Sequence, residues 1–311
     1  MNIQQIDYVL AVEELKSFSL AAEKCCVTQS TLSTMIGKLE DEMGIKIFDR
    51  KTKPISLTKE GKIVLQQLGL IAKEVNVLGE LVQSLKGELT GILHIGILAT
   101  VAPYILPAFL NDFAQKFPDI AFSISEMTTE TITERLLKRE LDVGILATPI
   151  AVKDLIEMPL YQEPFVLYDC TDINTTPYVQ LEEIDFSNFW LLEESHCLST
   201  QVKRICDLKE DREKAGINFD FKTGSIDSLI RFVHLNKGVT MLPYLASLDL
   251  TVAQKEKIKY FQPPVPVRAI SLVVHQHFVK KQILALLKAE IQEKVAPLLV
   301  SQDASFVVAP V

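Results

Sequence analysis

Apolar residues recur at helical spacing through the first fifty positions of the chain. Residues 2–15 predict a first helix, and residues 21–50 predict two short helices joined by a tight turn. The second of these carries one apolar stripe at spacings of four, three and four: Leu32, Ile36, Leu39 and Met43. Thr28 precedes it, and its hydroxyl can cap the helix by accepting a backbone N–H. The segment therefore predicts a helix-turn-helix, with a plain helical hairpin as the less favoured interpretation.

The face opposite this stripe carries short hydroxyl and amide side chains rather than the Glu and Lys of an ordinary solvated helix. Such side chains can reach phosphates and base edges without filling a major groove. After the helix, Pro54 interrupts residues 51–57 and predicts a short two-stranded hairpin, or wing, beside a small basic cluster. We therefore expect double-stranded DNA to contact these residues: Thr28, Gln29, Ser30, Thr31, Ser33, Thr34, Lys38, Arg50, Lys51 and Lys53.

Residues 58–86 carry the clearest apolar period in the chain. Spacings of four and three alternate along a heptad seam: Val64, Leu68, Ile71, Val75, Leu78, Val82 and Leu85. This seam is narrower than the stripe of a helix that packs on its own domain's core, so we favour self-association over that alternative. A two-fold dimer would present two recognition helices to two half-sites on DNA.

From residue 92 the pattern changes to apolar strands that alternate with helices. Strands are predicted at 93–98, 120–126 and 141–147, with helices at 103–117 and 132–139 between them. This βαβαβ order implies a parallel sheet with helices on its faces. Further strands are predicted within 155–169, at 190–193, within 222–243, and at 258–262 and 268–275, before a helix at 279–295. The last residues, 301–311, predict a loose tail that has enough apolar residues to dock.

The fold class that follows is α/β, with three parts along the chain. They are a winged helix-turn-helix at 1–57, a dimerising linker helix at 58–86, and a regulatory domain at 87–311. Within the regulatory domain, we expect one subdomain at about 90–162 and 268–300, and a second at about 163–267.

Charge and composition restrict the possible functions. The net charge is −8, and residues 1–62 hold nine Lys or Arg and nine Asp or Glu, so local placement rather than bulk charge must hold DNA. The N-terminus lacks the features of a signal peptide, and no apolar run reaches membrane-spanning length. We therefore expect a cytoplasmic protein without a membrane partner. The cysteines and histidines lack metal-site spacing, so we expect no metal and no cofactor.

Several motifs in register resemble the winged helix-turn-helix of LysR-type transcriptional regulators. They are AA at 21–22, TQSTLS at 28–33, Ile36, LE at 39–40, Gly44 and IFDR at 47–50. The two α/β halves, with GVTMLP at 238–243, are similar to that family's effector domain, which looks like a periplasmic binding protein. The resemblance covers essentially the whole chain. It implies operator DNA and RNA polymerase as partners, and a homodimer or homotetramer.

One segment, at 193–208, carries candidate redox chemistry. Cys197 and Cys206 are nine residues apart, with Lys203 and Arg204 between them. A reactive cysteine needs positive charge or hydrogen-bond donors that lower its pKa, and a second thiol can trap its sulfenic acid as a disulfide. A helix would hold the two thiols apart until the segment rearranged. The remaining cysteines are interpreted as small buried hydrophobes: Cys25, Cys26 and Cys170.

The same segment resembles the peroxide-sensing members of the LysR-type family. The matching stretches are HCL at 196–198 with Cys206, LHIGILATVAPYILP at 93–107 and EMTTETITERL at 126–136. The resemblance implies that hydrogen peroxide oxidises Cys197 and that Cys206 then closes the disulfide. It also implies a peroxide pocket: Thr100, Thr129, His196 and Arg268. Ser199 departs from the pattern, because these proteins often carry a basic residue there, and Lys203 or Arg204 would have to substitute for it.

Three functions are compatible with these sequence features. The first is a peroxide-sensing DNA-binding regulator switched by a reversible disulfide, and the second is a LysR-type regulator controlled by a small metabolite bound in the interdomain cleft. The third is a thiol peroxidase, which we disfavour because an enzyme has no use for a helix-turn-helix and a heptad helix. We therefore expect a regulator and not an enzyme. The number of thiols lost on brief exposure to dilute peroxide separates the first two.

Overall fold

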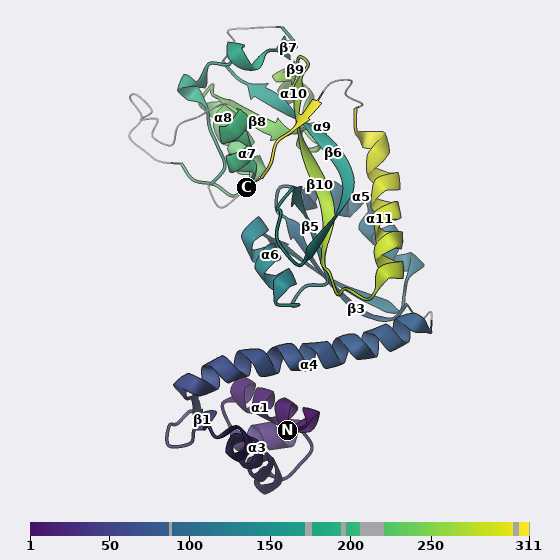
Figure 1. The fold of residues 1–311 in the computed structure, drawn as a ribbon. Coiled ribbons are helices and arrows are strands. Elements are labelled where there is room, and N and C mark those ends of the chain that lie inside the picture. Colours follow the sequence, from purple (N-terminus) through teal and green to yellow (C-terminus); the bar gives the residue numbers. More distant parts are fainter. Residues whose placement is uncertain (87–88, 172–175, 194–196, 206–220, 301–304, 311) are drawn as a thin grey trace. The chain divides into compact units, whose positions relative to one another are not determined.

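The chain folds into two compact units, Met1–Gly87 and Glu88–Val311. The structure is a computed structural model (Figure 1). It describes these residues: 1–86, 89–171, 176–193, 197–205, 221–300 and 305–310. The side chains of residues 83, 84 and 187 are also left undescribed.

The first unit is the predicted winged helix-turn-helix followed by a long helix. Its elements are α1 (Ile3–Leu15), α2 (Phe18–Lys24), α3 (Gln29–Met43), β1 (Phe48–Asp49), β2 (Ser56–Leu57) and α4 (Lys59–Leu85). The Thr28 hydroxyl caps α3 by accepting the N–H of Thr31 at 3.2 Å, and Gly44 ends the helix at a φ of 69°. The stripe residues Leu32, Ile36 and Leu39 are fully buried, so the predicted helix-turn-helix is confirmed.

The two halves of α4 have different environments. In the first half, Leu68 is only 2% exposed and belongs to the core of the first unit, with Val64 and Ile71 packed beside it. Gly61 permits this approach, because a Cβ there would lie 2.1 Å from the Ile47 carbonyl oxygen. The second half of the seam is exposed, with Leu78 at 61%. Leu68 therefore belongs to the core of its own unit. The heptad spacing had favoured self-association over such packing within the unit, and for Leu68 that preference is wrong.

The second unit is built on strands in the order β4-β3-β5-β10-β6-β9-β7, with β8 paired to β6 and β11 to β10. The strands are β3 (Gly91–Leu98), β4 (Ile120–Met127), β5 (Val143–Thr148), β6 (Leu155–Asp169), β7 (Tyr178–Val179), β8 (Val239–Pro243), β9 (Ile258–Phe261), β10 (Val265–His275) and β11 (Ser305–Val307). Strand β3 runs parallel to β4 and β5, which confirms the predicted parallel βαβαβ unit.

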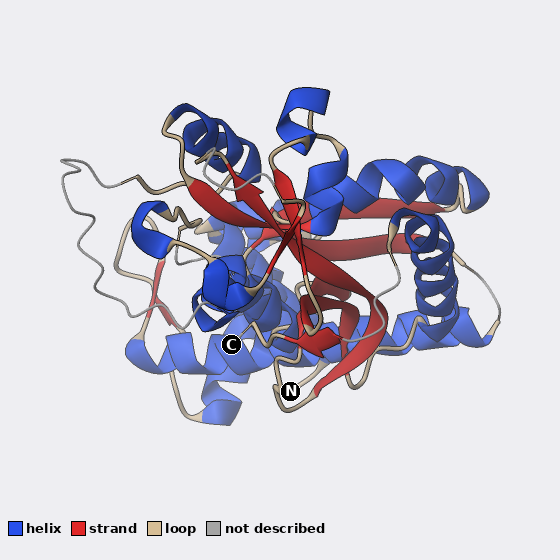
Figure 2. Ribbon diagram, turned by 90° about the horizontal axis from the view of Figure 1, so that it is seen from above, coloured by secondary structure: helices blue, strands red, loops and turns tan. Residues whose placement is uncertain are grey.

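Helices cover both sides of these strands (Figure 2). They are α5 (Ala102–Lys116), α6 (Thr129–Leu137), α7 (Cys197–Ile205), α8 (Ile226–Leu235), α9 (Tyr244–Leu248), α10 (Val252–Lys255) and α11 (Lys281–Val295). Short 3₁₀ turns lie at Leu181–Glu183, Phe186–Asn188 and Ala296–Leu298. Helices α5 and α11 pack together, whereas α6 packs on β3, β5 and β10.

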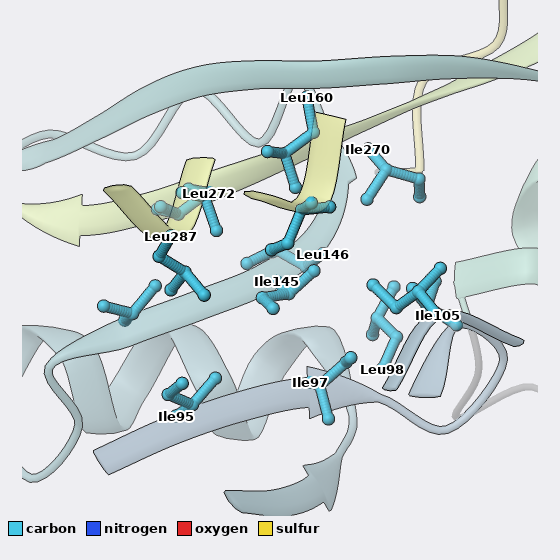
Figure 3. Packing of buried hydrophobic residues seen from close by; sticks show 14 of the residues in the cluster. Ile95, Ile97, Leu98, Ile105, Ile145, Leu146, Leu160, Ile270, Leu272 and Leu287 are labelled. Carbon is cyan, nitrogen blue, oxygen red and sulfur yellow. The ribbon is translucent and has the colours of Figure 1, made fainter. Parts of the chain in front are cut away.

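Two hydrophobic cores divide the second unit into lobes. The first-lobe core lies between the β3–β5 sheet and its helices. Ile97 and Ile145 are neighbours in register, and Leu287 of α11 belongs to the same cluster (Figure 3). The second-lobe core includes Trp190, Val202 and Leu242. Both lobes share β6 and β10, which are long antiparallel strands. Strand β6 continues past Pro164 to pair with β8 and β9, so the two lobes are joined by unbroken strands rather than by loops.

Two strands predicted for the second lobe do not form, whereas the tail docks, as its apolar residues allowed. Residues 190–193 form no strand: the Trp190 N–H donates to the Val239 carbonyl at 2.8 Å, but only the isolated Phe189–Val239 bridge accompanies it. No strand forms at 222–224 either. The tail does dock, because β11 pairs in parallel with the start of β10. Its apolar residues therefore form a short strand beside β10 and are not a loose tail.

Candidate functional site

The predicted DNA-binding side chains lie mostly exposed on α3 and on the β1–β2 turn. Gln29, Ser30, Thr31, Thr34 and Lys38 are exposed along α3, and Ser33 is half-buried. Thr28 is exposed at the cap, and its hydroxyl lies 2.8 Å from that of Thr31. Lys51 and Lys53 are exposed between β1 and β2. These residues form one polar face on the helix and a basic turn at the wing, as a DNA-binding surface requires.

Arg50 connects the wing to α3. Its guanidinium donates to the Ser33 hydroxyl at 2.8 Å and to the Glu40 carboxylate at 3.3 Å. It also lies over the Phe18 ring, 4.9 Å from the centroid. Glu40 is fully buried and accepts the backbone N–H of Ile47 at 2.8 Å. The Arg50–Glu40 pair thus fixes the wing on the recognition helix, a role that the sequence did not predict for either residue.

The candidate redox cysteine, Cys197, is the first residue of α7 and is 7% exposed. Its side chain packs in the first-lobe core, whereas its neighbours Leu198 and Val202 pack in the second-lobe core. Helix α7 therefore places the thiol across the junction between the lobes. A helix N-terminus also favours a negative charge, since its first backbone N–H groups lack partners in the helix.

A buried ion pair lies beside this thiol. Arg268 on β10 and Glu163 on β6 face each other in register, and the Arg268 Nε donates to a Glu163 oxygen at 2.7 Å. The guanidinium also donates to the Thr100 hydroxyl at 3.1 Å and to the Thr100 carbonyl at 3.0 Å. The second Glu163 oxygen accepts the N–H of Leu245 at 2.7 Å. The guanidinium is therefore held in one orientation by β6 and by the turn that follows β3.

Opposing effects act on the pKa of the Cys197 thiol. Burial is the largest, and it raises the pKa above its ordinary value. Thr129, Arg268 and the backbone N–H groups at the start of α7 act in the opposite direction. Thr129 is the first residue of α6, and among the described residues its buried hydroxyl oxygen has no partner in hydrogen-bond geometry. The site thus holds a protonated thiol among groups that stabilise a thiolate.

The structure brings together four of the predicted redox residues: Thr100, Thr129, Cys197 and Arg268. His196 and Cys206 lie outside the described residues. Arg268 is the cation that lowers the pKa of Cys197, so Lys203 or Arg204 is not needed to substitute for a basic residue at position 199. Arg204 instead donates to the Ala309 carbonyl at 3.2 Å.

Sequence reasoning missed Glu163. The available signal was an acidic residue inside the apolar stretch YQEPFVLY, because a buried charge in a strand needs a partner. Sequence reasoning also misjudged Cys26, which is exposed at the turn before α3 rather than buried. Cys25 is half-buried and Cys170 is buried, with its sulfur 3.8 Å from His234 Nδ1.

The described part of the chain holds neither a membrane-spanning helix nor a cluster of metal ligands. No described helix is long and apolar enough to cross a membrane. No group of three or more His, Cys, Asp or Glu side chains in the described ranges is arranged to hold a metal ion.

Known proteins match this chain along most of its length. Residues 3–62 match the bacterial regulatory helix-turn-helix protein family, lysR type, and residues 86–296 match the LysR substrate binding domain. A "Hydrogen peroxide-inducible genes activator" of Haemophilus influenzae is 32% identical over 88% of this chain and 90% of its own length. The "DNA-binding transcriptional dual regulator OxyR" of Escherichia coli is 33% identical over 79% of this chain and 80% of its own.

A solved structure agrees with these matches. Full-length OxyR from Pseudomonas aeruginosa superposes with a TM-score of 0.71 at 27% identity, over 94% of this chain and 98% of that one. That protein therefore shares the arrangement of a helix-turn-helix, a long helix and an α/β domain. The chain belongs to the LysR family of bacterial transcriptional regulators, which bind DNA and are not enzymes.

Proposed function

We propose that this regulator senses hydrogen peroxide through a reversible Cys197–Cys206 disulfide. One arrangement carries the proposal: Arg268, held by Glu163 and Thr100, and the Thr129 side chain lie at one buried cysteine at a lobe junction, where both lower a pKa that burial raises. Cysteines with structural roles are usually inert because apolar surroundings keep them protonated. Reactive cysteines lie beside cations and hydrogen-bond donors, and Arg268 and Thr129 are such groups at Cys197.

The chemistry of the first step follows from these groups. The Cys197 thiolate attacks one oxygen of hydrogen peroxide, the O–O bond breaks, and the products are Cys197 sulfenic acid and hydroxide, which takes up a proton to become water. Arg268 and the Thr129 side chain stabilise the thiolate before the attack. Thr100, Thr129, Cys197 and Arg268 are all buried, which favours a reactant as small as peroxide.

The second step requires α7 to change. The eight-residue rise from Cys197 to Ile205 along a helix is about 12 Å, at about 1.5 Å per residue. A disulfide needs Cα atoms about 4.4–6.8 Å apart. A bond between Cys197 and Cys206 therefore cannot form while α7 stays helical. Oxidation would move residues 198–205 out of their present packing and so alter the surface of the second lobe.

The relatives support this proposal and its partners. The Haemophilus influenzae relative is named as an activator of genes induced by hydrogen peroxide. We propose operator DNA bound by α3 and the wing, with Arg50, Lys51 and Lys53 near phosphates, and RNA polymerase as a further contact. We also propose a homodimer or homotetramer in which the exposed end of α4 pairs with a second copy: Leu78, Val82 and Leu85.

Thiol mapping tests the proposal. Brief treatment with dilute peroxide should remove two titratable thiols per chain and yield a Cys197–Cys206 cross-linked peptide by mass spectrometry. Cys197→Ser should abolish the cross-link, because an alcohol is not a nucleophile of comparable strength at neutral pH. Cys206→Ser should leave Cys197 as sulfenic acid, which over-oxidises more readily.

The matched control for thiol mapping is Cys170→Ser. It removes another buried thiol, which lies in the second-lobe core, and should change nothing. A cross-link that includes Cys170 would defeat the proposal. Peroxide-insensitive thiols, together with a small metabolite that changes DNA binding, would favour the alternative of a ligand in the interdomain cleft.

A further inference from the structure

The C-terminal segment Ser305–Pro310 is bound on two sides. On one side, β11 pairs in parallel with β10, with Val265 opposite Ser305 and Val267 opposite Val307. The N–H of Val308 continues this pairing by donating to the Val267 carbonyl at 2.9 Å. The side chain of Val308 is 5% exposed, whereas that of its neighbour Val307 is 43% exposed. The segment is thus anchored on a strand that runs through both lobes.

On its other side, the segment contacts α7, the helix that begins with Cys197. The Gln201 side chain is completely buried, and its Nε2 donates to the Val308 carbonyl at 2.7 Å. One turn later, Arg204 donates to the Ala309 carbonyl at 3.2 Å. Cys197, Gln201 and Arg204 are spaced four and three apart, so they share one face of the helix. The segment that follows β11 passes beside this helix in Figure 1.

Helix α7 carries two buried polar atoms that lack hydrogen-bond partners among the described residues. The Ser199 hydroxyl and the Gln201 Oε1 are buried and, within the described ranges, have no hydrogen-bond partner. Each such atom disfavours the packed state relative to a state in which water reaches it. The bond from Gln201 to Val308 offsets part of this cost. The bonds of Gln201 and Arg204 to the C-terminal segment therefore contribute to holding α7 in this packing.

We propose that residues 305–310 act as a strap that holds α7 in its reduced packing and so sets how readily the cysteine switch closes. The effect on the cysteine switch rests on the proposed function, whereas the packing of residues 305–310 against α7 is a property of the reduced protein. In the closing step, the Cys206 thiol attacks the sulfenic sulfur of Cys197, an S–S bond replaces the S–O bond, and water leaves. Residues 198–205 must leave their packing for this step, which breaks the Gln201 and Arg204 bonds to the strap.

Two adjacent residues provide a matched test. Val308→Asp places a charge at a buried position and should release the strap, whereas Val307→Asp adds the same charge at an exposed position next to it. Gln201→Met keeps a side chain of similar size but leaves the buried Val308 carbonyl without its donor, so it tests the strap even if Val308→Asp fails to fold. All variants are made in the full-length chain.

The first measurement is hydrogen exchange of the α7 amides in the reduced protein without peroxide. We expect Val308→Asp and Gln201→Met to speed exchange by about threefold to tenfold, the factor for loss of one hydrogen bond of ordinary net strength, and Val307→Asp to match the unmodified chain. Unchanged α7 exchange in both strap variants would overturn the strap. Equally fast α7 exchange in Val307→Asp would also overturn the strap.

The second measurement is the rate at which sulfenic acid converts to disulfide after a pulse of peroxide. Strap variants should close about threefold to tenfold faster, with the rate of sulfenic acid formation unchanged. A chain whose α7 exchange responds as expected but that never forms the Cys197–Cys206 disulfide would refute the proposed function and leave the strap standing. Faster exchange without faster closure would refute the strap as a control on the switch.

Discussion

Replacing Arg268 with Met should damage the protein in two separable ways. The substitution removes the cation from a buried pair in which Glu163 and Arg268 are both essentially unexposed. Breaking a buried ion pair by deleting one partner costs about 3–5 kcal/mol, because the other charge is left without compensation. That loss is a large part of the ~5–15 kcal/mol by which a typical domain is stable. Arg268→Met alone should therefore unfold at a clearly lower urea concentration.

The second effect of Arg268→Met is on the thiol. Arg268 lowers the pKa of Cys197 against the dominant effect of burial, which raises it. Without the cation, the pKa rises further, and the thiolate fraction at neutral pH falls about tenfold for each unit of pKa. Because only the thiolate attacks peroxide, the rate at neutral pH should fall in proportion. In both proteins the rate should rise with pH toward the thiol pKa, and the rise should come at higher pH in the variant.

A double variant separates these effects. Adding Glu163→Gln to Arg268→Met removes the unpaired carboxylate and keeps an oxygen for the Leu245 N–H. The double variant should regain much of the lost stability in urea titrations, yet its reaction with peroxide in stopped-flow measurements should stay slow. Recovery of the reaction rate in the double variant would show that Arg268 acts only through folding. The assignment of Arg268 to the thiol would then be wrong.

Two further predictions concern the first unit. Lys53→Ala should weaken binding to all DNA sequences alike and lower the salt slope of binding by roughly one unit, measured by titration at several salt concentrations; a changed base preference at one operator position would contradict a backbone contact. Leu78→Asp should convert the oligomer to a smaller species in analytical ultracentrifugation without loss of stability, because Leu78 is exposed within its own unit. Leu68→Ala is the converse control, since it should lower stability by about 2–5 kcal/mol and leave the mass unchanged.

Local patterns predicted the elements of the first unit well. The stripe of α3 and its Thr28 cap are set by residues within one helix, so periodicity and capping rules identify them directly. The heptad period of α4 was harder to interpret. Leu68 and Leu78 obey the same spacing, but one is buried in its own unit and the other is exposed. Spacing reports that a face is apolar and does not report which surface covers it.

The geometry of the redox site depended on pairing between distant segments. The Arg268–Glu163 contact joins residues 105 positions apart, and it follows from the register of β6 against β10. Sequence periodicity does not give the register of strands so far apart, so Glu163 was missed. Thr100 and Arg268 were predicted from the family resemblance alone, and the structure brings them together by two hydrogen bonds.

The continuous strands bear on how a signal could leave the proposed site. Strands β6 and β10 each pass through both lobes, and Glu163 and Arg268 link them at the junction. A hinge between the lobes would have to bend both strands and disturb this buried pair. Helix α7 begins at the thiol itself and carries two buried polar atoms without partners within the described residues. Oxidation of Cys197 should therefore refold α7 while the lobes keep their relative position, and the altered second-lobe surface around α7 would carry the signal to another copy of the chain.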